Sequence, residues 1–143
     1  MQVPLQAAID EAKLGMVGGG VPIGSVLVLD DQIIGRGHNR QTQLDSIIRH
    51  AELDCIDNAG AVSTRDFQRS ILYTTLSPCD MCAGAILFFK IPRVVIGDNK
   101  NYQGAEAYLQ SRGVILEILN DPQCIRMLQE FDQKYPGVWN KGE

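Results

Sequence analysis

The chain has 143 residues, of which 45% are hydrophobic and 21% charged, a composition typical of a soluble globular protein with one substantial core. Its 17 acidic and 13 basic residues give a formal net charge of −4, so nucleic acid is disfavoured as the main partner. Neither a leader segment nor a run of transmembrane length is visible. We therefore expect one cytoplasmic domain over residues 1–143, without a membrane partner.

The first half of the chain predicts a helix, a hairpin and a second helix. Apolar residues recur at helical spacing over 3–17. Two apolar runs, 25–29 and 33–37, flank a polar turn and predict a β-hairpin. After a polar loop, a helix begins near His50 and ends at a glycine signal, Gly60.

The second half alternates strands with helices. Strands are expected at 71–76, 93–97 and 114–119, and helices at 79–90, 105–112 and 122–135. A hairpin followed by this alternation predicts an α/β fold, a three-layer α/β/α sandwich with a five-stranded mixed sheet. In such sheets, binding sites lie where a helix begins after a strand.

An H-A-E triplet and a P-C-D-M-C segment carry the residues with metal chemistry. Cys79 and Cys82 are three residues apart at a predicted helix start, so both thiolates can bind one ion. Side chains in a first helical turn lean back towards its start, which lets His50 and Glu52 reach a common point. Three nitrogen and sulfur ligands suit Zn²⁺ and leave a position open for water. We predict a Zn²⁺ site formed by His50, Cys79 and Cys82.

Glu52 has a chemical role beside such an ion. Two thiolates cancel the charge of Zn²⁺, so its water loses a proton less readily and a general base is needed. Glu52 could take that proton, pass it to a ring nitrogen and later help to protonate a departing amine. We therefore predict that Glu52 is the catalytic residue.

Two other interpretations of the cysteines fit the sequence less well. A closed structural zinc site needs a fourth ligand, but the candidates His38, Cys55 and Cys124 do not lie at finger-like spacing. A redox C-x-x-C leaves the H-A-E triplet unexplained. Cys55 and Cys124 are expected to be buried small hydrophobic residues.

At these motifs the chain resembles the zinc-dependent cytidine and deoxycytidylate deaminase superfamily, and most closely the fungal-type cytosine deaminases. The matching segments are 20–24, 35–39, 50–52, 72–82, 91–93 and 108–110, together with a tail that contains tryptophan. The zinc motif and Asn39 are shared with tRNA adenosine deaminases and bacterial guanine deaminases. The S-P-C-D form and the C-terminal tryptophan indicate the cytosine branch.

The resemblance implies a cytidine deaminase-like fold, a homodimer, and hydrolysis of a small free base, most closely cytosine to uracil and ammonia in pyrimidine salvage. Its implied substrate-binding residues are Asn39, the backbone of Ala51, Tyr102 and Trp139. The amide of Asn39 complements the N1–H and C2=O edge of a free pyrimidine, an edge that a nucleoside lacks.

The tail departs from the family pattern. An aspartate is expected three residues after Trp139, but Gly142 stands there, and Glu143 is the candidate replacement. Tyr102 also stands where that branch has phenylalanine. These two departures leave a modified pyrimidine or an amino-azine as alternative substrates. Guanine deaminase and tRNA adenosine deaminase are the alternative activities. A zinc-stabilised binding module without turnover is the alternative outside enzymology.

Overall fold

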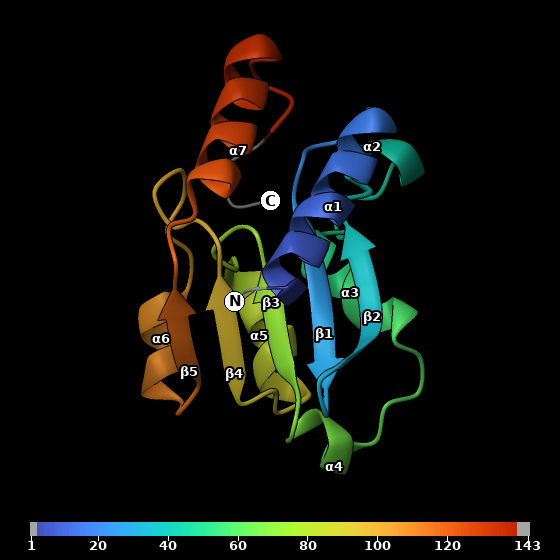
Figure 1. Ribbon diagram of the computed structural model, residues 1–143, viewed down its shortest axis with the longest axis vertical. Helices are drawn as coiled ribbons and strands as arrows, with labels where there is room; N and C mark the ends of the chain where they lie inside the picture. The colour runs from blue at the N-terminus through green and yellow to red at the C-terminus, as the bar shows by residue number, and fades with distance from the viewer. Residues whose placement is uncertain (1–2, 140–143) are drawn as a thin grey trace.

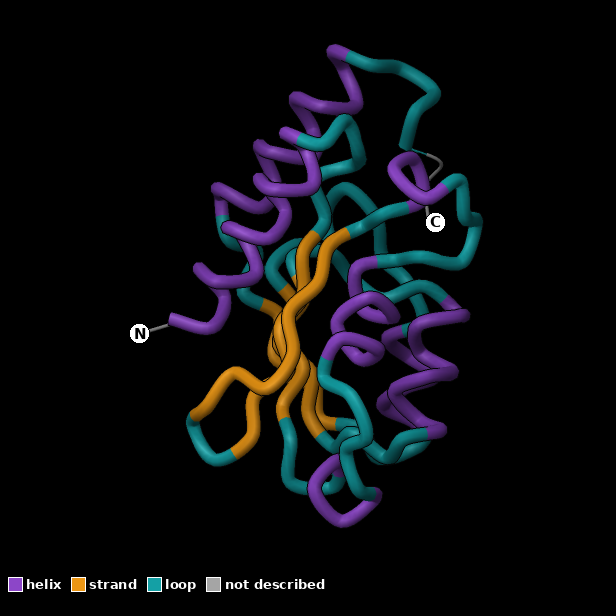
Figure 2. The backbone as a smooth tube through the Cα atoms, turned by 90° about the vertical axis from the view of Figure 1, so that its right-hand side faces the viewer, coloured by secondary structure: helices purple, strands orange, loops and turns teal. Residues whose placement is uncertain are grey.

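The computed structural model describes residues 3–139. A five-stranded sheet of order β2-β1-β3-β4-β5 lies between two layers of helices (Figures 1 and 2). Its strands are β1 (Gly24–Leu29), β2 (Gln32–His38), β3 (Ile71–Thr74), β4 (Arg93–Ile96) and β5 (Ile115–Ile118). β1 pairs antiparallel with β2 and β3, whereas β3, β4 and β5 run parallel. The predicted mixed sheet and three-layer class are confirmed.

The helices cover both faces of this sheet. One layer contains α1 (Val3–Val17) and α7 (Pro122–Lys134), and the other contains α3 (Ala51–Asn58), α5 (Asp80–Phe88) and α6 (Glu106–Ser111) (Figure 1). Two short helices, α2 (Gln41–Leu44) and α4 (Thr64–Phe67), lie in loops and were not predicted. None of the helices within residues 3–139 is long and apolar enough to span a membrane.

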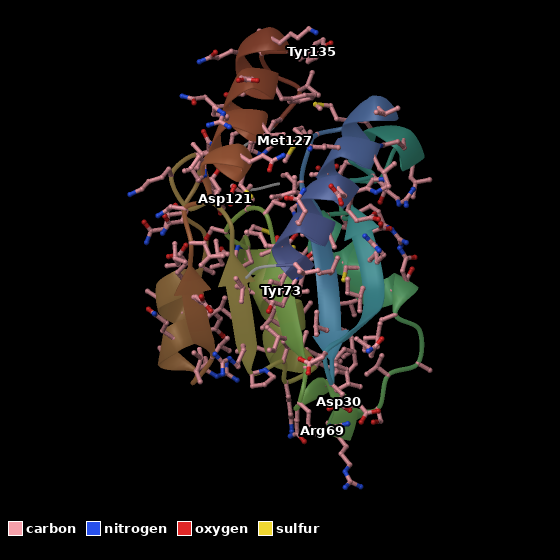
Figure 3. All side chains as sticks on the ribbon, in the orientation of Figure 1. Asp30, Arg69, Tyr73, Asp121, Met127 and Tyr135 are labelled. Carbon is pink, nitrogen blue, oxygen red and sulfur yellow. The ribbon has the colours of Figure 1, made fainter. Side chains whose placement is uncertain are left out.

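Alternating side chains of the strands divide the core into two layers. Val26 and Val28 are buried against α1, together with the ring of Tyr73, which Figure 3 places at the centre of the sheet. Leu27 and Leu72 point to the opposite face, into the larger cluster that α3 and α5 complete. This period of two is the expected geometry of a strand that is covered on both faces.

The hairpin is tighter than expected. Its loop consists of Asp30 and Asp31, both with positive φ (50° and 62°), and Gln32 already belongs to β2. Two consecutive left-handed residues match the twist of the flanking strands. Asp30 also accepts a hydrogen bond from Arg69 at 2.7 Å, at the end of the molecule opposite to α7 (Figure 3).

Candidate metal centre and substrate cavity

The starts of two helices converge behind the sheet. His50 is the N-cap of α3 and Cys79 is the N-cap of α5. His50 Nδ1 lies 3.4 Å from both Cys79 Sγ and Cys82 Sγ. Within residues 3–139 these three side chains form the one group whose ligand atoms are close enough to share an ion, and all three are buried.

The donor set fits Zn²⁺. One imidazole and two thiols within such distances are the ligands of a zinc centre that keeps an open position. Hydrogen bonds with Cys82 and His50 lower the pKa of Cys79 to about 4, although burial acts the other way. The hydrogen bond with Cys79 raises the pKa of Cys82, and burial adds to it. One proton therefore stays with the pair until a metal displaces it.

The other two cysteines have a packing role, as predicted. Cys55 is fully buried in the main core cluster, and burial raises its pKa well above the ordinary value. Cys124 lies in the smaller cluster beside α1, and burial raises its pKa to about 12. Among the described residues, neither thiol belongs to a group whose ligand atoms are close enough to share an ion.

A small cavity opens beside the metal ligands. Its free volume is about 10 Å³, and it is lined by Ile23, Asn39, His50, Ala51, Glu52, Leu76, Ser77, Cys79 and Tyr102. A larger groove of about 800 Å³ lies between α1 and α7, but no metal-ligand group lies in it among the described residues. The small cavity, which is lined by His50, Glu52 and Cys79, is therefore the candidate active site.

Glu52 lies in the first turn of α3 with only 4% of its surface exposed. Burial raises the pKa of Glu52 to about 7, while the charge of His50 acts in the opposite direction. A carboxyl group with a pKa near neutrality can both accept and return a proton. The burial and the raised pKa of Glu52 are therefore compatible with the predicted role as a proton shuttle.

Asn39 follows β2 and is completely buried. Its Oδ1 accepts from the Gln41 backbone N–H at 3.0 Å, and its Nδ2 donates to Gln41 Oε1 at 2.8 Å. Because a backbone N–H can only donate, its partner must be the amide oxygen, and this fixes the orientation of the Asn39 amide. One lone pair on Oδ1 and one hydrogen on Nδ2 are still available to a ligand.

The predicted aromatic residues occupy different positions. Tyr102 lines the cavity, whereas Trp139 lies next to it, 4% exposed, in an apolar cluster with Ala51 and Phe131. Trp139 thus belongs to the same apolar cluster as the cavity-lining residues Ile23 and Leu76. Glu143 and Gly142 lie outside the described residues.

Sequence reasoning missed a hydrogen-bonded support of the cavity. Ser77 Oγ donates to the buried carboxylate of Glu106 at 2.6 Å and accepts from the Gly104 backbone N–H at 2.9 Å. The next backbone N–H, that of Ala105, donates to the Pro78 carbonyl at 2.9 Å. These bonds join the segment before Cys79 to the loop that carries Tyr102. A lone glutamate in a short helix gives no local signal of such a role.

Comparison with known proteins identifies the family. Residues 2–98 match the family model of the cytidine and deoxycytidylate deaminase zinc-binding region. The chain belongs to the cytidine and deoxycytidylate deaminase family. The prediction of a zinc-dependent deaminase, made from the two motifs, is confirmed.

Individual relatives agree with this assignment. The deaminase is 43% identical to cytosine deaminase of Candida albicans over 138 residues, which is 96% of this chain and 92% of that protein. A solved tRNA:A34 deaminase superposes with a TM-score of 0.72 at 29% identity, covering 90% of this chain and all of that one. Guanine deaminase from Nitrosomonas europaea superposes with a TM-score of 0.73 over 91% of this chain and 83% of that one; at 19% identity it shows the fold alone.

Proposed function

We propose that this deaminase hydrolyses free cytosine to uracil and ammonia, a reaction of pyrimidine salvage. The observation that carries the proposal is a small cavity in which the amide of Asn39 and the buried carboxyl of Glu52 lie beside the three metal ligands. The identity with cytosine deaminase of Candida albicans, extending over nearly the whole chain, supports the same substrate.

The residues divide the reaction between binding and proton transfer. Asn39 accepts from the N1–H of the base and donates to its C2 carbonyl, and the Ala51 backbone N–H adds a donor at the start of α3. Tyr102 packs against the ring. Zinc, held by His50, Cys79 and Cys82, supplies Lewis-acid activation of water when bound.

Glu52 moves the protons. It removes one proton from the attacking water and delivers it to the N3 atom of cytosine. It then takes the second proton from the hydroxyl on C4 and passes it to the leaving amino group. The C4–N bond breaks and a C4–O bond forms, so cytosine and water give uracil and ammonia. Trp139 supports this cavity through its apolar cluster. Glu143, the candidate replacement for the missing aspartate, remains a proposed substrate-binding residue.

Ammonia release tests the substrate. We expect turnover of cytosine and much slower turnover of 5-methylcytosine, guanine, cytidine and an anticodon stem-loop RNA. Activity confined to guanine or to the RNA would overturn the proposal. Glu52→Gln should retain zinc and lose about 10²–10⁴-fold in turnover, since the shuttle is gone. The matched control is Glu117→Gln, an exposed carboxylate on β5, which should keep the wild-type rate.

We further propose that the enzyme is a homodimer built on α5. Every residue of this helix except Asp80 is apolar, yet Gly84 is exposed and Phe88 is 78% exposed. A helix that is apolar all round is normally buried. Phe88→Glu should convert the dimer to a monomer in sedimentation, whereas Val3→Glu on α1, across the sheet, should not. Wild-type protein that sediments as a monomer would refute this.

We also place the enzyme in the cytoplasm. All four cysteines are free, and two of them must stay reduced to bind zinc.

A further inference from the structure

Asp54 is a fully buried acid of α3 to which the reaction assigns no role. Its carboxylate accepts four hydrogen bonds. Oδ2 accepts from the His38 backbone N–H at 3.1 Å, from Arg40 Nε at 2.9 Å and, at 3.4 Å, from Asn58 Nδ2. Oδ1 accepts from Arg49 Nε at 2.8 Å. Asp54 is therefore a fixed junction between segments that are distant in sequence.

The partners of Asp54 flank the substrate cavity. His38 and Arg40 are the two chain neighbours of Asn39, and Arg49 immediately precedes the metal ligand His50. The backbone N–H of Arg40 also donates to the Arg49 carbonyl at 3.0 Å. One carboxylate thus holds the segment that carries Asn39 against the helix that carries Glu52 and His50.

The close approach of β2 to α3 makes this junction possible. A Cβ atom on Gly37 would lie 2.8 Å from Asp54 Oδ2 and 2.7 Å from the Asp54 carbonyl carbon. Glycine at this position lets the strand end come within hydrogen-bonding distance of the helix. The sequence is thus arranged to bring the acid to the residues next to Asn39.

We propose that Asp54 is a positioning residue that sets where Asn39 holds the base relative to Glu52 and the metal. The inference rests on the proposed function, in which Asn39 binds cytosine. Displacing the Asn39 segment from α3 moves the base away from Glu52, and a shift of about 1 Å in such a site can cost on the order of 100-fold in rate.

A purely structural ion pair is the competing explanation, because removing one partner of a buried pair also destabilises a protein. The experiment must therefore separate substrate positioning from folding. We choose a double-mutant cycle between Asp54→Asn and Asn39→Ala, with kcat and KM for cytosine, zinc content and urea unfolding measured for each protein.

Asp54→Asn should lower kcat/KM for cytosine at least about tenfold, mainly through a lower kcat because the base is displaced from Glu52, while zinc stays at one per chain. In the Asn39→Ala background the same change should cost less than about threefold, because the group being positioned is absent. Asp57→Asn is the control. This carboxylate lies on the same helix and also pairs with Arg49, at 2.9 Å, but is 67% exposed, so kcat/KM should stay within about twofold of wild type.

Arg40→Met provides a second variant if Asp54→Asn does not fold. Arg40 is 34% exposed, and its loss leaves Asp54 bonded to the His38 backbone N–H and to Arg49. The urea midpoint should therefore fall less than in Asp54→Asn, while kcat/KM for cytosine still falls at least about threefold. If Asp54→Asn lowers kcat/KM by the same factor in wild type and in Asn39→Ala, the positioning role is wrong, while the proposed function stands. Unchanged kcat/KM in Asn39→Ala would overturn both this inference and the proposed base-binding role of Asn39.

Discussion

Gly104 is the point where the loop carrying Tyr102 touches the segment that leads to Cys79. A Cβ atom there would lie well inside van der Waals contact of the Pro78 carbonyl oxygen and 2.6 Å from the carbonyl carbon. Gly104→Ala must therefore push the loop back by about 1 Å. That shift breaks the two bonds of 2.9 Å, from Gly104 N–H to Ser77 and from Ala105 N–H to Pro78.

The expected cost follows from these contacts. Two hydrogen bonds at about 1 kcal/mol each, with residual overpacking, lower the free energy of unfolding by about 2–4 kcal/mol. With a slope of about 2 kcal/mol per molar urea, the unfolding midpoint should fall by about 1–2 M. KM for cytosine should rise as well, because Tyr102 lines the cavity.

Urea titration followed by fluorescence, with zinc bound, measures this shift. Gln103→Ala, an exposed neighbour in the same loop, is the control and should change stability by no more than about 0.5 kcal/mol. A Gly104→Ala midpoint within about 0.3 M of wild type would show that the loop yields freely, and the reasoning from close contact would be wrong.

Three further predictions concern stability. Burial raises the pKa of Glu52 to about 7 from 4.5, so in chelator the folded state keeps a proton that the unfolded chain loses, and wild-type stability falls as pH rises through that window. The free energy of unfolding of metal-free Glu52→Gln, minus that of metal-free wild type, should thus be about 2–3 kcal/mol larger at pH 8 than at pH 5 in urea titrations. A difference that does not change with pH would contradict this. Asp121→Ala removes the cap bonds to the N–H groups of Gln123 and Cys124 and should lower Tm by about 2–4 °C in calorimetry, whereas an unchanged Tm would mean that water replaces the cap. Ile86→Ala empties a fully buried core position and should cost about 2–5 kcal/mol in urea unfolding, and a loss below about 1 kcal/mol would mean that the core collapses around it.

Most of the fold could be predicted because its elements have strong local patterns. The expected helix over 3–17 coincides with α1, and the other predicted helices and strands lie within about two residues of their observed ends. The short helices α2 and α4 were not predicted, because a segment of four residues is too short to show the helical spacing of apolar side chains. In α4 the deciding contact is a cap in which Ser63 Oγ accepts from the Asp66 backbone N–H.

In the site, too, residues that belong to a local motif were predicted and residues that meet only in the folded structure were not. The ligands His50, Cys79 and Cys82 were predictable because their spacing at helix starts is itself the signal. The residues around them were not: Glu106 meets Ser77 across 29 positions and Asp54 meets His38 across 16. Such contacts are fixed by how the strands and helices pack, so they leave no short motif. The two hydrogen bonds between Asn39 and Gln41 are local, but they are common in turns that bind nothing.

The spacing of the three ligands also bears on how zinc acts on the unfolded chain. Cys79 and Cys82 are close enough in sequence to bind zinc while the chain is still unfolded, whereas His50, 29 residues from Cys79, joins them only when α3 and α5 meet. A metal that also binds the denatured chain stabilises the native state only by the difference between the two affinities. The contribution of zinc to folding is therefore set by the third ligand, and the cysteine pair can take up the ion ahead of folding.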